Sequence, residues 1–191
     1  MRCFIAIELP EAVKSTLSGI EEELKKSKAD VRWVKPDNVH LTLKFFGNIE
    51  EKKTEKIIEI MEGICNQYAS FPIEIKGMGT FPNIKSPRVL WVGIEGNDTL
   101  KTLQKEIENR MESIGFERED RAFTAHLTLG RFRSSIEKEG LLKAVKLHEK
   151  DTFVGSINVQ SLSLIRSDLH PEGARYTKII DIPLGKTTAN T

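Results

Sequence analysis

The sequence predicts an α+β fold with antiparallel sheets, and two observations lead to this class. Segments typical of strands and helices intermix without the regular strand–helix alternation of a parallel sheet. The second half of the chain also follows the layout of the first half. Its most specific repeat is the tetrapeptide His-Leu-Thr-Leu, which begins at His40 and again at His126 in a chain with four histidines.

The composition is that of a globular protein without a membrane span. Hydrophobic residues make up 39% of the 191 residues and charged residues 30%, so the chain can bury a sizeable core. No segment approaches the roughly 18 apolar residues of a spanning helix. The apolar run before Pro10 is too short for a secretory signal. We therefore expect a cytoplasmic monomer with no membrane partner.

Charge and cysteine content exclude two further classes. A formal net charge of +1 is not that of a protein with a polybasic surface, so a polyanion would have to bind in a local basic cleft. Cys3 and Cys65 form neither a CxxC pair nor a metal-ligand spacing, and we expect buried free thiols. No other residues form a convincing metal set, so we expect no metal site.

Apolar spacing and turn residues define the elements of the first half. Apolar residues that recur every three or four positions predict helices, and alternation between turn-forming residues predicts strands. The first helix carries its apolar residues at Val13, Leu17, Ile20 and Leu24. The expected elements are a strand at Cys3–Leu9, a helix at Glu11–Lys26, strands at Val31–Val34 and Val39–Phe46, a helix at Glu51–Tyr68, and strands at Phe71–Gly79 and Arg88–Ile94.

The second half has a similar succession of elements. A helix of similar length has its apolar side at Leu100, Leu103, Ile107, Met111 and Ile114. The expected elements are a helix at Thr99–Ile114, a strand at His126–Phe132, a helix at Ile136–Leu147, and strands at Thr152–Val159, Ser161–Ser167 and Tyr176–Ile182. Pro171 and Gly173 predict a turn between the last two strands. Trp33 and Trp91 lie in apolar strands, where we expect them in the core.

The repeated tetrapeptide places an imidazole and a hydroxyl on one side of a strand. Residues two apart on a strand share a face, so His40 and Thr42 project together while Leu41 and Leu43 point into a core. His126 and Thr128 are expected to do the same. A single histidine on a strand is more often structural than catalytic. Two such motifs together favour a function.

Two imidazoles that face each other across a cleft can share the cleavage of a phosphodiester. One accepts a proton from the attacking oxygen while the other donates a proton to the leaving oxygen. The hydroxyls of Thr42 and Thr128 can donate hydrogen bonds to the non-bridging oxygens. This chemistry requires no metal. The sequence alone does not assign the acid and the base, because the roles exchange in the reverse reaction.

The segments VHLTLKFFG and FTAHLTLGRFR resemble the two HxTx signatures of the 2H phosphoesterase superfamily. Within it, the chain is similar to the bacterial and archaeal RNA 2′,3′-cyclic phosphodiesterases, once named 2′-5′ RNA ligases. The segments MRCFIAIELP, PRVLWVGI and LIRSDLHPEGARYTKIIDIPL fit this family too, so the resemblance spans essentially the whole chain. It implies one two-lobed domain over residues 1–191, with approximate two-fold symmetry and both motifs in the cleft between the lobes.

The resemblance also implies an activity. Family members hydrolyse a terminal 2′,3′-cyclic phosphate of RNA to a 2′-phosphate without a metal or cofactor. His40 would be the proton donor and His126 the proton acceptor, with Thr42 and Thr128 beside them. The implied partner is RNA with a cyclic phosphate end, and tRNA fragments are one candidate source. Alternatives are another cyclic or 2′-5′ phosphodiester, the reverse ligation, or binding of RNA ends without turnover.

Two residues that follow the motifs are candidates for substrate binding. Phe45 and Arg131 each lie five positions after a motif histidine, where family members similarly place an aromatic residue and an arginine. Phe45 can stack on a base, and Arg131 can neutralise a phosphate. Simple alternation places both on the core face, so a bulge, for example at Gly130, would be needed to turn Arg131 toward the cleft. For Phe45 a core position is an equal alternative.

Overall fold

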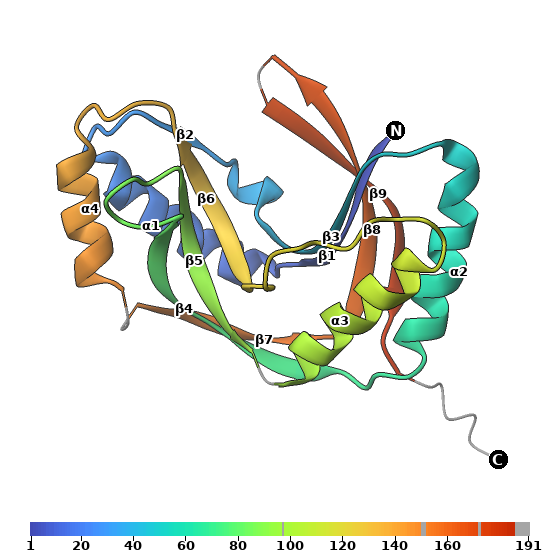
Figure 1. Cartoon of the computed structure of the whole chain (residues 1–191). Helices are drawn as coiled ribbons and strands as arrows, with labels where there is room; N and C mark the ends of the chain where they lie inside the picture. Colours follow the sequence, from blue (N-terminus) through green and yellow to red (C-terminus); the bar gives the residue numbers. More distant parts are fainter. Residues whose placement is uncertain (97, 150–151, 172, 186–191) are drawn as a thin grey trace.

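The computed structural model describes residues 1–96, 98–149, 152–171 and 173–185, which form two antiparallel sheets flanked by helices (Figure 1). Sheet 1 has the strand order β3-β1-β8-β9, and sheet 2 has the order β2-β6-β5-β4-β7. The expected α+β class with antiparallel sheets is confirmed. None of the described helices is both long and apolar enough to cross a membrane.

The strands and helices occur in the expected order along the chain. Sheet 1 contains β1 (Arg2–Glu8), β3 (His40–Asn48), β8 (Ser161–His170) and β9 (Gly173–Pro183). Sheet 2 contains β2 (Val31–Trp33), β4 (Phe71–Phe81), β5 (Val89–Gly96), β6 (His126–Phe132) and β7 (Phe153–Val159). The helices are α1 (Glu11–Lys25), α2 (Thr54–Cys65), α3 (Asp98–Glu112) and α4 (Lys138–Leu147), with short 3-10 turns η1 (Pro36–Asn38) and η2 (Glu51–Lys53).

Each half of the chain contributes a helix to the other lobe. Helices α2 and α3 lie against sheet 1, while α1 and α4 lie against sheet 2 (Figure 1). Yet α1 follows β1 of sheet 1, and α3 follows β5 of sheet 2. The strand run β3-β1-β8 in sheet 1 therefore corresponds to β6-β5-β4 in sheet 2. This exchange gives the molecule two interlocked lobes with approximate two-fold symmetry.

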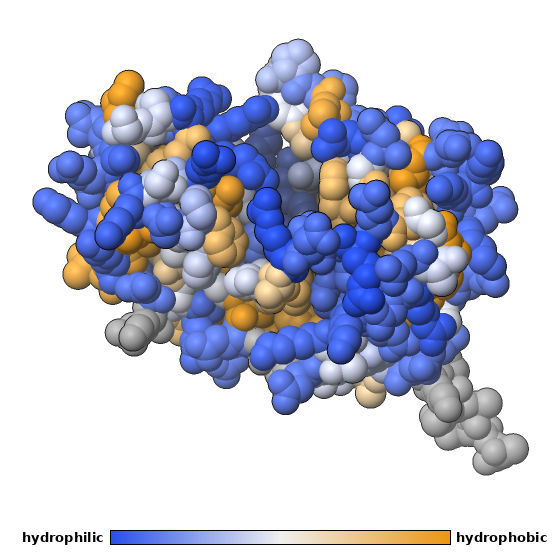
Figure 2. Space-filling view, in the orientation of Figure 1, coloured by the Kyte–Doolittle hydropathy of each residue, from blue (hydrophilic) through white to orange (hydrophobic). Residues whose placement is uncertain are grey.

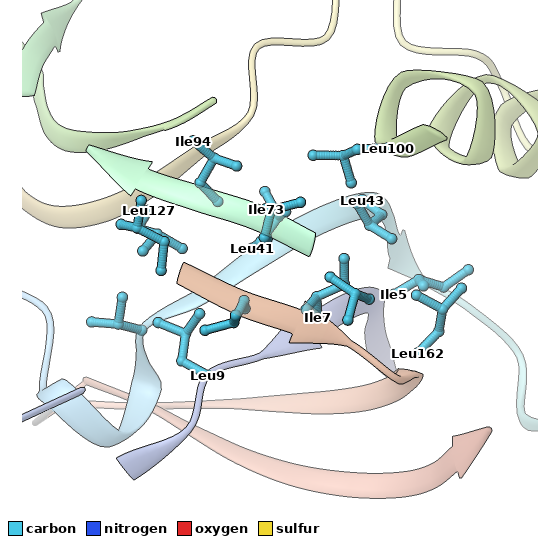
Figure 3. Packing of buried hydrophobic residues seen from close by; sticks show 14 of the residues in the cluster. Ile5, Ile7, Leu9, Leu41, Leu43, Ile73, Ile94, Leu100, Leu127 and Leu162 are labelled. Carbon is cyan, nitrogen blue, oxygen red and sulfur yellow. The ribbon is translucent and has the colours of Figure 1, made fainter. Parts of the chain in front are cut away.

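One hydrophobic core joins the two lobes. The leucines of both motifs belong to the same cluster of buried residues, together with the apolar faces of the four helices. Leu41 and Leu43 of the first motif and Leu127 of the second all belong to this cluster (Figure 3). The expectation that the motif leucines face a core is confirmed. Because these leucines are buried, the alternate residues of both strands point away from the core.

A β-bulge interrupts the first motif strand after its threonine. Thr42 and Lys44 pair with consecutive residues of β1, which leaves Leu43 without an opposing residue. A bulge adds one residue to one strand and reverses the face of the residues that follow. Phe45 therefore lies on the same face of sheet 1 as His40, where its ring is 49% exposed. The core position considered for Phe45 is wrong.

The second motif strand contains a bulge at the equivalent position. Thr128 and Gly130 pair with consecutive residues of β5, and Leu129 is left without an opposing residue. Arg131 is consequently turned to the same face of sheet 2 as His126. The bulge lies one residue before Gly130. Simple alternation, which places Arg131 on the core face, is thus corrected by the extra residue in the strand.

The residue after each bulge faces the core, and its surroundings differ between the two sheets. Lys44 is 5% exposed and forms an ion pair of 2.6 Å with Glu108 of α3. Its ammonium also donates a hydrogen bond of 2.5 Å to the carbonyl oxygen of Glu117. The equivalent residue in the second motif is Gly130, which packs against Val31 of β2. A side chain at this position has no space.

Four details differ from the sequence expectation. The predicted helix at Glu51–Tyr68 begins with the 3-10 turn η2 and ends at Cys65, and α4 begins at Lys138. Strands β8 and β9 extend into the predicted turn, because residues 168–170 pair with residues 173–175 and Gly173 adopts a φ of 131°. Trp33 and Trp91, both expected in the core, are half-buried: Trp33 packs against the core, whereas Trp91 pairs with Thr128 and shares the cleft-facing side of sheet 2.

The close contact at Gly130 predicts a cost for any larger residue there. In Gly130→Ala the added Cβ would lie 2.5 Å from Cγ1 of Val31. We expect this variant to lower the free energy of unfolding by about 1–3 kcal/mol in urea denaturation. Gly19→Ala is the matched control, because Gly19 lies in α1 with no atom within 4 Å of the added Cβ. In that control the free energy of unfolding should rise by roughly 0.5–1 kcal/mol. Equal stability of both variants with the wild type would contradict the packing described.

Candidate active site

The two motif histidines are held by the same kind of hydrogen bond. Nδ1 of His40 lies 2.7 Å from the carbonyl oxygen of Asn38, two residues earlier in the chain. Nδ1 of His126 lies 2.7 Å from the carbonyl oxygen of Thr124, again two residues earlier. A carbonyl oxygen can only accept a hydrogen bond, so Nδ1 carries the hydrogen in both rings. This assignment leaves Nε2 of each ring to exchange protons with a substrate.

Aromatic rings enclose His40. The imidazole stacks on Phe4 with ring centres 4.6 Å apart, and Tyr176 contacts it edge-on at 5.2 Å. Burial lowers the pKa of His40, while the Asn38 carbonyl and the charge of Glu8 oppose this shift. The free ring therefore favours its neutral form. Because two aromatic contacts and one hydrogen bond hold it, the ring has a defined orientation.

His126 occupies the equivalent place in sheet 2 among different neighbours. Phe81 of β4 contacts its ring edge-on at 4.9 Å, and Phe81 in turn lies 5.2 Å from the ring of Trp91. The indole covers Gly79 so closely that a Cβ on this glycine would overlap the ring. The wall beside His126 is thus aromatic, and Trp91 fills the space next to it.

The threonines of both motifs share the faces of their histidines. Thr42 and Thr128 are each half-buried and precede the bulge of their strand. Each hydroxyl is therefore two residues from its imidazole, on the side of the strand that points away from the core. This is the arrangement that the alternation of the motif predicts.

Two arginines from different lobes act on one tyrosine. Burial raises the pKa of Tyr176 in sheet 1, and the positive charges of Arg131 and Arg2 oppose this effect. Arg131 belongs to sheet 2, so its charge reaches across to the His40 side. The guanidinium of Arg2 lies 5.2 Å from the ring centre of Phe45. Arg131 of sheet 2 and Arg2 of sheet 1 therefore both act on Tyr176, which contacts His40.

A polar cavity of about 200 Å³ adjoins His40. It lies where sheet 1 meets α1 and η1, and the space-filling view shows the molecule hollowed between its two lobes (Figure 2). Its wall is formed by Glu8, Lys14, Asn38, Ile165, Tyr176 and Lys178. Lys178 forms an ion pair with Glu8, and the hydroxyl of Ser163 contacts the same carboxylate at 3.0 Å.

Sequence reasoning missed several residues that surround His40. Tyr176 was expected only as the start of a strand, and Asn38 lies between two of the expected strands. The amide of Asn38 donates a hydrogen bond of 2.9 Å to the carbonyl of Ala174, which joins the β8–β9 hairpin to the first motif. No local sequence pattern predicts a contact between residues so far apart in the chain. Among the described residues, no group of three or more His, Cys, Asp or Glu side chains is placed to hold a metal ion.

Comparisons with known proteins agree with this architecture. The family model of the LigT like phosphoesterases matches the chain twice in succession, at residues 7–91 and 92–176. The boundary falls between the two halves that each contribute one HxTx strand. A protein from Methanothermobacter thermautotrophicus, named RNA 2′,3′-cyclic phosphodiesterase, is 36% identical over 93% of this chain and 95% of its own length. A protein of the same name from Thermotoga maritima is 37% identical over 92% and 91%.

Solved structures show the same fold. The structure of TT0787 from Thermus thermophilus superimposes with a TM-score of 0.82 at 25% identity, covering 96% of this chain and 98% of that one. The structure of E. coli LigT complexed with 3′-AMP has a TM-score of 0.79 at 24% identity, covering 96% and 97%. The two matches of the family model correspond to the two halves of the chain, and each half contains one His-Leu-Thr-Leu strand. The chain belongs to the LigT-like phosphoesterase family, which confirms the family resemblance recognised in its sequence.

Proposed function

We propose that this protein hydrolyses the 2′,3′-cyclic phosphate ends of RNA to 2′-phosphate ends without a metal ion. The observation that carries the proposal is the pair of imidazoles whose Nδ1 atoms bond to the carbonyl two residues earlier. Two rings prepared in the same way for proton exchange at Nε2 suit a reaction that needs one acid and one base. The names of the relatives at 36% and 37% identity support the substrate class.

In the proposed reaction each proton has a defined source and destination. Nε2 of His126 accepts a proton from water as the water oxygen attacks phosphorus. The bond between phosphorus and O3′ breaks, and O3′ takes the proton from Nε2 of His40. The hydroxyls of Thr42 and Thr128 donate hydrogen bonds to the non-bridging oxygens, where negative charge grows. The products are a 2′-phosphate and a free 3′-hydroxyl.

The role of His40 as the acid depends on the bound substrate. Burial lowers its pKa, which favours the neutral ring in the free protein. A phosphate anion in the cleft would raise that pKa again, because an opposite charge stabilises the imidazolium. The proposed substrate therefore brings the acid to its working protonation state. Arg131 would share the neutralisation of the phosphate, and the exposed ring of Phe45 offers a base a surface to stack on.

We further infer that residues 1–191 act as one two-lobed domain. A single cluster of buried side chains extends through both sheets, so neither lobe has a separate core. A monomer contains both motifs and needs no residue from a second copy. We propose a cytoplasmic monomer that acts on RNA ends, with tRNA fragments as one candidate source.

The proposal predicts a specific product. The protein incubated with an RNA that ends in a 2′,3′-cyclic phosphate should release a 2′-phosphate end, both in buffer with chelator and in buffer with magnesium. Phosphorus NMR of the product locates the phosphate. Loss of activity in chelator that only a divalent ion restores would overturn the metal-independent chemistry. Tight binding of the RNA with no product would favour the alternative of RNA-end binding, and joined RNA would favour ligation.

The assigned roles predict that one histidine variant is rescued by a better leaving group. His40→Ala and His126→Ala should each reduce kcat by roughly 10²–10⁴-fold on the natural substrate. A substrate with sulfur in place of O3′ expels a thiolate that needs no proton. His40→Ala should therefore recover most of its rate on this substrate, while His126→Ala should remain slow.

His148→Ala is the matched control for these variants. His148 is exposed at the end of α4 in lobe 2, and its replacement should leave both substrates unaffected. Rescue of His126→Ala in place of His40→Ala would show that the acid and the base are exchanged. A fully active, folded His126→Ala protein would exclude this histidine from the reaction.

A further inference from the structure

The residues opposite the two motif histidines differ in charge. Glu8 of β1 lies opposite His40 in sheet 1, and side chains opposite each other on neighbouring strands share a face. The residue opposite His126 in sheet 2 is Gly93 of β5. A Cβ on Gly93 would lie 2.7 Å from the carbonyl oxygen of Lys76, so no side chain fits there. The place that holds a carboxylate beside His40 is therefore closed to one beside His126.

Two contacts within sheet 1 fix the carboxylate of Glu8. Lys178 of β9 forms an ion pair with it, and the hydroxyl of Ser163 of β8 lies 3.0 Å from Oε2. Ser163 is 1% exposed and its hydroxyl also contacts the carboxylate of Asp181 at 2.7 Å. Because a buried hydroxyl and an ammonium both hold it, the carboxylate of Glu8 has a defined place on the His40 face of the sheet.

Charged side chains from four elements line the cavity next to His40. They are Glu8 of β1, Lys14 of α1, Asp37 of η1 and Lys178 of β9. Lys14 is paired with Glu11 at 3.0 Å. Arg2 of sheet 1 and Arg131 of sheet 2 act on Tyr176, which contacts His40 edge-on. The negative charge of Glu8 opposes the fall in the pKa of His40 that burial causes.

An acid and a base need opposite help from their surroundings. The histidine that protonates O3′ must carry its proton, whereas burial favours the neutral ring of His40. A nearby carboxylate stabilises the imidazolium, because opposite charges attract. The histidine that accepts a proton from water must be neutral, which suits a ring whose cross-strand neighbour is a glycine. The difference between Glu8 and Gly93 thus has the sign that the proposed roles require.

We propose that Glu8 is a positioning residue for the hydrolysis, whose charge, held in place by Lys178 and Ser163, favours the protonated ring of His40 and so makes this histidine the acid. The inference rests on the proposed function, in which Nε2 of His40 gives its proton to O3′. Glu8 acts through His40. Lys178 limits the effect, because its ammonium neutralises part of the carboxylate charge.

The ion pair gives opposite expectations for its two members. Glu8→Gln removes the negative charge and leaves the ammonium of Lys178 unpaired, which should lower the pKa of His40. Lys178→Met leaves the carboxylate of Glu8 unpaired, which should raise the pKa of His40. The double variant loses both charges and should titrate close to the wild type. Damage to the fold would not move the two single variants in opposite directions, nor would a second substitution repair it.

Nitrogen-15 NMR of the free protein at low ionic strength measures this order directly. The pKa of His40 should be highest in Lys178→Met, intermediate in the wild type and the double variant, and lowest in Glu8→Gln. Glu59→Gln is the matched control, because Glu59 forms an exposed ion pair of 2.8 Å with Lys56 on α2. It should titrate as the wild type does. This measurement needs no substrate, so it tests the effect of Glu8 separately from the hydrolysis.

The pH dependence of kcat/KM then tests the consequence for the reaction. Above the pKa of both histidines, kcat/KM is proportional to the fraction of protein that has His40 protonated. Glu8→Gln should therefore lower kcat/KM by about threefold to tenfold at alkaline pH, and change it little at acidic pH, where the base limits the rate. On the substrate with sulfur in place of O3′ the leaving group needs no proton. The deficit of Glu8→Gln should disappear there.

The outcomes separate this inference from the proposed function. An unchanged titration of His40 in Glu8→Gln, or shifts of both single variants in the same direction, would overturn the inference. A deficit of Glu8→Gln that is equal at all pH values and on both substrates would also overturn it, because Glu8 would then not act through the acid. Failure of the wild type to open either substrate would overturn the hydrolysis, while the titration would still decide whether Glu8 acts on His40.

Discussion

The burial of the motif leucines constrains the whole site. Leu41 and Leu127 are 1% and 0% exposed in one shared core, so the imidazole one residue before each leucine must point away from that core. The bulge that follows in each strand then returns the later residues to the imidazole face. Without it, Phe45 and Arg131 would be buried with the leucines. The site thus follows from how β3 and β6 are anchored. Both strands have a buried leucine after the histidine and a bulge after the threonine.

The sequence predicted the α+β class and the faces of both motifs, because alternation is a local property, whereas the two lobes were implied only by the family resemblance. It did not place the bulges, since Leu43 and Leu129 continue the alternating pattern without a break. Their carbonyl groups are satisfied by distant partners: the amide of Gln104 approaches the carbonyl of Leu43 at 3.4 Å, and the backbone of Val34 donates to that of Leu129 at 2.8 Å. A bulge stabilised from another element leaves no signature in its own strand.

The surroundings of His40 were unpredictable for the same reason. Phe4 and Tyr176 come from distant parts of the chain, and only the sheet order brings them to the ring of His40. Their combined effect is to exclude water and fix the ring plane, at the cost of a lowered pKa. His126 has a more open, aromatic wall from one lobe. Two motifs with identical sequence therefore acquire different environments, as the proposed roles of acid and base require.

The central claim is that both rings are held as the tautomer with hydrogen on Nδ1, which leaves Nε2 for catalysis. Nitrogen-15 NMR of the labelled protein, titrated through neutral pH, tests it most directly. We predict that the neutral rings of His40 and His126 both carry their hydrogen on Nδ1, and that His40 titrates below the usual histidine value of about 6.5. A neutral His40 or His126 with its hydrogen on Nε2 would contradict the account.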